Sequence, residues 1–216
     1  MFGYGKNWHP IPNARMMVAL MVESNDKYRE LAKKLAEKSN LPQKKHDKFI
    51  NIYGIFHYDY EQLLNTLKNN QGGEGVAFTV DSLEVRKKWK DYLINGRILI
   101  DYLGLQSREC LSLKNDISGL NKKKFKTLLD SLDNKEETYK ELKKIEETIL
   151  LFIDTRNQEK ISSDTIVEFP CIDSEYGIIR DGKIKIENNF FNMIDFIEKS
   201  FHSIQKLTFL LLKISN

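Results

Sequence analysis

The stretch 138–161 constrains the fold of this chain most strongly, because its apolar residues recur at helical spacing. These residues fall three or four positions apart, and they are Leu142, Ile145, Ile149, Phe152 and Ile153. Such spacing places side chains on one face of an α-helix. We therefore predict a long helix with one buried apolar stripe. Continued by one turn, this stripe reaches Arg156 and Asn157.

Two interpretations of Arg156 remain open from the sequence alone. In the structural one, the cation interacts favourably with the negative end of the helix dipole, and its aliphatic stem covers apolar surface while the guanidinium stays in water. In the functional one, Arg156 and Asn157 line a cleft or a dimer seam and bind an anion, with phosphate as the best candidate. The reason to consider it is that an unpaired buried charge is costly.

Further helices are indicated on both sides of this stretch. One runs through residues 82–103, with Gly96 as a possible close-packing point inside it. Its apolar face comprises Val85, Trp89, Leu93, Ile100 and Leu103. A preceding helix is expected to begin at Asp59 as its N-cap, and the last helix is expected to begin at Asn188 or Asn189.

The pattern changes from helix to strand before that last helix. Asp181-Gly182 stands between two apolar-rich runs, and this dipeptide suits the positive φ angles of a type I′ turn. We therefore predict a small β-hairpin around it, packed against the helices. The predicted fold class is mainly α: a helical bundle in a single domain, residues 1–216, with a small β-hairpin before the last helix and an irregular arm at residues 1–12.

The charge balance excludes a strong global attraction to nucleic acid. The formal net charge is +3, from 34 basic and 31 acidic residues, so nucleic-acid binding would need a local patch. The densest basic run is Lys122, Lys123, Lys124 and Lys126. Solvated lysines are the simpler interpretation, but these four residues are the first candidates for a nucleic-acid-binding surface.

Metal, cofactor and membrane binding are not expected from the sequence. The two cysteines, Cys110 and Cys171, lack the spacing of a metal site or a disulfide framework, so we expect no metal or other cofactor. The longest apolar runs are too short to span a bilayer, and residues 1–12 do not resemble a secretory signal. A cytoplasmic protein is the simplest expectation.

The order of these elements resembles the HEPN superfamily of bacterial helical bundles. The resemblance covers roughly residues 82–216, and the segment Asp154-Thr155-Arg156-Asn157 carries it. It implies a homodimer that acts on RNA in a defence or toxin–antitoxin system, with Arg156 and Asn157 as provisional catalytic residues. The family motif also has a histidine a few residues further on, where this chain has Ile161. The four histidines of the chain are His9, His46, His57 and His202.

The missing histidine changes the expected function. An arginine stays protonated, so it can stabilise a developing negative charge but cannot exchange the protons that RNA cleavage requires. We therefore expect a protein that binds RNA or a partner protein, such as an antitoxin, and is not a standard ribonuclease. Two alternatives are a non-enzymatic adaptor that binds a protein through its N-terminal arm and last helix, and a ribonuclease that pairs Arg156 with the remote His202.

Overall fold

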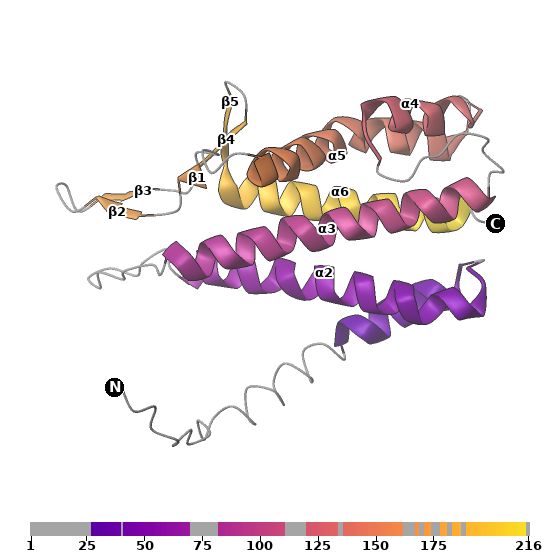
Figure 1. Ribbon diagram of the computed structural model, residues 1–216, viewed down its shortest axis with the longest axis horizontal. Coiled ribbons are helices and arrows are strands. Elements are labelled where there is room, and N and C mark those ends of the chain that lie inside the picture. The colour runs from indigo at the N-terminus through magenta and orange to yellow at the C-terminus, as the bar shows by residue number, and fades with distance from the viewer. Residues whose placement is uncertain are drawn as a thin grey trace, which may run out of the picture.

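A computed structural model describes residues 27–39, 41–69, 82–110, 120–133, 136–161, 167–168, 171–173, 178–180, 183–186 and 189–214 (Figure 1). Residues 27–37 form the first described helix. The other helices are α2 (Gln43–Asn69), α3 (Ser82–Cys110), α4 (Lys122–Asp130), α5 (Glu137–Ile161) and α6 (Met193–Ile214). The predicted fold class is confirmed: a helical bundle with a small β element before the last helix. The N-terminal arm expected at residues 1–12 lies outside the described residues.

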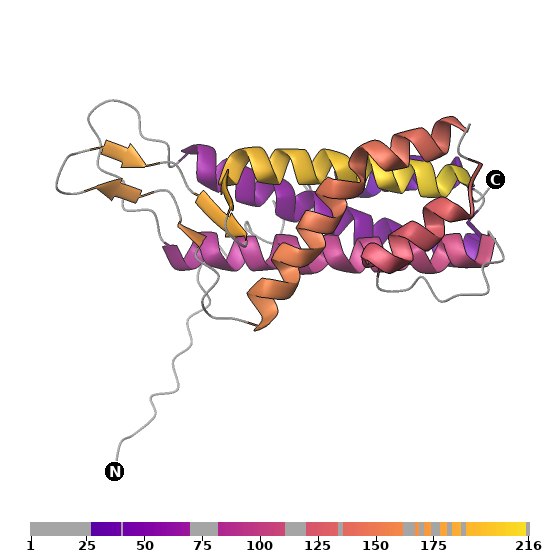
Figure 2. The same cartoon turned by 90° about the horizontal axis from the view of Figure 1, so that it is seen from above.

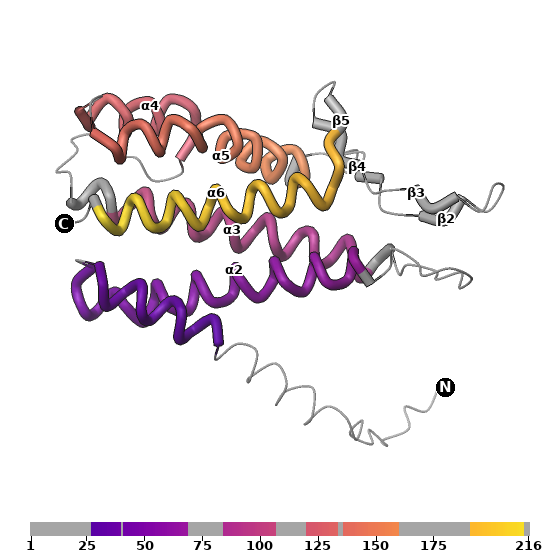
Figure 3. Tube along the Cα trace, turned by 180° about the vertical axis from the view of Figure 1, so that it is seen from behind, coloured from indigo at the N-terminus to yellow at the C-terminus, as the bar shows by residue number. Residues whose placement is uncertain are grey.

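The long helices α2, α3 and α6 run side by side, and α5 crosses α3 and α6 obliquely (Figures 1 and 2). The first described helix lies against α2 (Figure 3), where Arg29 donates a hydrogen bond to Asn51 and the ring of Tyr28 stacks on His57. The short helix α4 contacts α5 at one end of the bundle. One side of α3 thus faces α5 and the residues just before α4.

The two apolar faces expected from helical spacing are buried. All five stripe residues of α5 and all five of α3 belong to the core. Gly96 faces the rings of Phe56 from α2 and Phe152 from α5. A Cβ added there would lie 2.6 Å from Cζ of Phe152 and 2.8 Å from Cε2 of Phe56. The expected close-packing role of Gly96 is therefore confirmed.

The N-cap expected at Asp59 is wrong, because α2 is one continuous helix that begins at Gln43. Upstream of Asp59, the aromatic residues Phe49, Tyr53 and Phe56 are buried at helical spacing, so apolar burial extends the helix in that direction. Asp59 lies inside the helix, where its carboxylate accepts a hydrogen bond from Asn95 of α3 at 2.6 Å.

The strands flank Asp181-Gly182 as predicted, but they do not pair across it. Strand β3 (Ile178–Arg180) pairs with β2 (Cys171–Asp173), whereas β4 (Lys183–Ile186) lies between β1 (Val167–Glu168) and β5 (Asn189–Asn192), with antiparallel pairing throughout. Both edges of β4 are thus already occupied, so β3 cannot pair with it. The hairpin before the last helix is β4–β5.

The N-cap of α6 is Asn192 and not Asn188 or Asn189. Its Oδ1 accepts hydrogen bonds from the backbone N–H groups of Ile194 at 2.9 Å and Asp195 at 3.2 Å. Asn189 belongs to β5, where it is paired with Ile186, so the helix starts after the strand has ended. Among the described residues, no helix has the length and apolar character that crossing a membrane requires.

Candidate nucleic-acid interface

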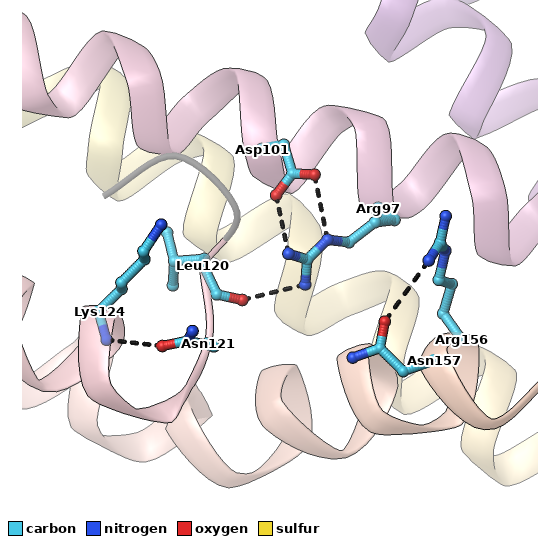
Figure 4. Close-up of polar contacts among 7 residues, drawn as sticks. All are labelled: Arg97, Asp101, Leu120, Asn121, Lys124, Arg156 and Asn157. Atoms are coloured by element: carbon cyan, nitrogen blue, oxygen red, sulfur yellow. Dashed lines mark hydrogen bonds and ion pairs between the residues drawn. The ribbon is translucent and has the colours of Figure 1, made fainter. Parts of the chain in front are cut away.

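The start of α4 is held against α3 by Arg97. This guanidinium donates from Nη1 to the carbonyl oxygen of Leu120 at 3.0 Å and from Nε to Oδ2 of Asp101 at 3.1 Å (Figure 4). Its Nη2 lies 3.1 Å from Oδ1 of Asp101, within ion-pair distance but out of line for a hydrogen bond. Because Leu120 immediately precedes the N-cap of α4, this ion pair and hydrogen bond position the beginning of that helix.

The local sequence then decides which face of α4 is exposed. Asn121 caps the helix in an extended conformation, and its side chain accepts the backbone N–H of Lys124 at 3.0 Å. The buried face comprises Phe125, Leu128 and Leu129. Lys122, Lys123 and Lys126 are exposed. At about 100° per residue, Lys124 leaves the helix about 200° away from both Lys122 and Lys126.

The exposed face of α4 borders a groove shared with α5, which we call the lysine groove. It has a volume of about 540 Å³ and is open to solvent. Its lining residues are Lys122, Lys123, Lys126, Leu129 and Asp130 from α4, and Tyr139, Lys143 and Glu146 from α5. The structure thus brings three of the four predicted lysines together, and Lys124 is not among the lining residues.

The lysine groove carries an excess of positive charge, since four lysines face two carboxylates. Lys143 donates to Glu146 at 2.5 Å, and this hydrogen bond raises the pKa of Lys143. Within the part of the chain that the structure describes, the ammonium groups of Lys122, Lys123 and Lys126 have no ion-pair partner. Three cations are therefore available to an anionic ligand.

Arg156 and Asn157 lie in a second place, between α5 and α3. Arg156 is half-buried, and its guanidinium extends from α5 toward α3 (Figure 4). Nη1 donates to Oδ1 of Asn157 at 3.5 Å, the upper limit for a hydrogen bond. A smaller pocket of about 180 Å³ lies here, lined by Lys90, Leu93, Ile94, Arg156 and Glu159. An anion could bind beside Arg156 and Lys90, although Lys90 already lies 3.5 Å from Glu159.

The described histidines make their contacts away from Arg156. Nε2 of His46 lies 2.8 Å from the carbonyl oxygen of Leu41. His57 and His202 both pack edge-on against Phe201, with ring centroids 4.8 Å and 5.7 Å away. Burial lowers the pKa of His57 to about 4, so this ring is neutral at physiological pH. His9 lies outside the described residues.

Sequence reasoning missed the α5 side of the lysine groove. Tyr139, Lys143 and Glu146 recur at helical spacing on the face of α5 next to its buried stripe, and this signal was available. That this face meets the lysines of α4 depends on tertiary packing. Over the described ranges, no group of three His, Cys, Asp or Glu side chains is placed to hold a metal ion.

Comparisons with protein families, with curated proteins and with solved structures find no match to this chain.

Proposed function

We propose that this protein binds RNA through the lysine groove, in a bacterial defence or toxin–antitoxin setting such as the HEPN resemblance implies. The observation that carries the proposal is the gathering of three ammonium groups, those of Lys122, Lys123 and Lys126, along one open groove, with no ion-pair partner among the described residues. Lysines so placed contact phosphates and release the counterions condensed on RNA, which supplies most of the free energy of sequence-independent binding.

The same proposal makes the protein a binder of RNA and not a standard ribonuclease. Ile161 occupies the place of the motif histidine, and the contacts of His46, His57 and His202 lie elsewhere. Arg156 keeps its proton and can serve as a further phosphate contact, but it cannot act as a general base. A homodimer with Arg156 near its two-fold axis, as the resemblance implies, is part of the proposal.

The test is RNA binding measured by fluorescence anisotropy in EDTA, between about 50 and about 200 mM KCl. The variant replaces Lys122, Lys123 and Lys126 by Gln. A matched control replaces the exposed Lys33 and Lys34 of the first described helix, and Lys38 just after it, by Gln, which removes the same charge. We expect the groove variant to bind more weakly, with the slope of log K against log salt reduced by about two.

Three outcomes would contradict the proposal. Failure of the wild-type protein to bind RNA would contradict the proposal directly. An equal loss of RNA affinity in the two lysine variants would show that only net charge matters. RNA cleaved in EDTA by the wild type, but by neither Arg156→Ala nor His202→Ala, would instead identify a ribonuclease.

A protein-binding adaptor is the second candidate function, and exposed apolar side chains on α3 favour it. Ile94, Ile98 and Leu105 share one face of the helix and are 45%, 44% and 40% exposed. Apolar groups gathered on a surface often mark a protein-binding site. In that case the lysine substitutions would leave RNA affinity unchanged. Arg156→Ala would lower the stability of the protein and would not affect RNA binding.

A further inference from the structure

We infer that the lysine groove selects single-stranded RNA, with one base stacked on Tyr139 and the neighbouring phosphates held by the lysines of α4. This inference rests on the proposed function and names its ligand more closely. Tyr139 is the only aromatic residue among those lining the groove in the described structure. A base that stacks on an aromatic ring needs no particular sequence, because every base has a π-face.

The position of Tyr139 suits this role. It is half-buried and packs partly against the core, so its ring is held in place before any ligand arrives. Lys143 follows one turn later on the same face of α5, and the lysines of α4 lie across the groove. An aromatic ring between cations in a groove is the combination that single-strand-binding proteins use.

The charged residues of α4 indicate the path of the RNA backbone along the groove. Lys122 and Lys126 are one turn apart, about 6 Å along the helix axis, so they can contact different phosphates of one strand. Asp130 follows Lys126 by a further turn and lines the same groove, and its carboxylate repels phosphate. The backbone should therefore follow the Lys122 end of the groove and turn away before Asp130.

Duplex RNA cannot use the ring in this way. In a double helix the flat faces of the bases are stacked on one another, so only their edges and the phosphates are accessible. A duplex could still contact the lysines, but it would gain nothing from Tyr139. Selectivity for single strands is thus the property that separates this inference from phosphate binding alone.

The experiment compares three probes of about 12 nucleotides: oligo(A), an abasic strand of the same length, and a blunt duplex. Tyr139→Leu removes the ring and keeps apolar bulk for the core, and Tyr139→Phe keeps the ring. We expect Tyr139→Leu to bind oligo(A) about tenfold more weakly and the abasic strand and duplex unchanged. Tyr139→Phe should match the wild type on all three probes.

Circular dichroism and thermal unfolding of both variants establish that the comparison is made between folded proteins. If the lysine variant loses RNA but Tyr139→Leu does not, or if the duplex binds as tightly as oligo(A), the inference is wrong and the proposed function stands. If the wild type binds none of the probes, the proposed function itself fails. An acidic peptide that displaces oligo(A) at equal charge would point to a protein ligand and overturn the inference.

Discussion

Gly96 shows how closely the helices pack at the level of single residues. Gly96→Ala would place a methyl group against the rings of Phe152 and Phe56, at 2.6 Å and 2.8 Å from their nearest atoms. Overpacking of this kind costs about 1–3 kcal/mol, and the better helix propensity of Ala offsets about 1 kcal/mol of that. We expect a net loss of stability in urea unfolding.

The control is the double variant Gly96→Ala with Phe152→Leu, which removes the ring that the methyl group meets. Part of the lost stability should return if the clash is the cause, as a double-mutant cycle would measure. If the two substitutions lower the free energy of unfolding additively, the contact between the methyl group and the Phe152 ring is not the cause of the loss.

Asp59 makes a pH-dependent contribution to stability. Burial raises its pKa to about 6, the hydrogen bond from Asn95 lowers it, and the nearby charge of Asp91 raises it. The native state therefore binds this proton more tightly than the unfolded chain does, so the contribution is full below about pH 4 and is lost as pH rises through about 6. Asp59→Asn should raise the thermal midpoint at about pH 8 and change it little at about pH 4.

The comparison must be made between variant and wild type at each pH, because His57 titrates in the opposite sense. Its lowered pKa means that stability is lost as pH falls from about 6.5 toward about 4. An equal shift of the midpoint by Asp59→Asn at both pH values would show that the carboxyl group does not titrate as described.

At the scale of elements, the start of α6 depends on the side chain of Asn192. Asn192→Ala removes the acceptor for two backbone N–H groups, which should cost about 1 kcal/mol in chemical unfolding. Asn192→Asp keeps an acceptor oxygen at the positive end of the helix dipole, so it should retain wild-type stability. A loss as large in Asn192→Asp as in Asn192→Ala would mean that the amide matters for another reason.

Helical spacing was enough to predict α3 and α5, because their buried residues repeat over many turns. The helix boundaries and the pairing of the strands were harder to predict from the sequence. The aromatic residues before Asp59 follow the helical period as well as those after it, and only the packed structure shows that α2 is unbroken. For the strands, a local turn signal says that the chain reverses, but which strand occupies each edge of β4 depends on segments further away.

For the whole molecule, the candidate site was predictable in part. The run of lysines in α4 is visible in the sequence, and its cap and buried face decide which of them point outward. The other side of the groove is not visible there, since it requires α4 to contact α5. Arg156 was expected on the buried stripe. It lies half-buried at the C-terminal end of the stripe, whereas the adjacent Thr155 is fully buried and donates to the carbonyl oxygen of Leu151.

The two candidate anion sites, the lysine groove and the pocket beside Arg156, also differ in which parts of the chain form them. Both sides of the lysine groove come from one stretch of the chain, residues 122–146, although Arg97 of α3 positions the start of that stretch. The pocket beside Arg156 combines α3 with α5, which are separated along the chain. A change in how α5 packs on α3 would therefore alter the pocket beside Arg156 while leaving the contact between α4 and α5 in place.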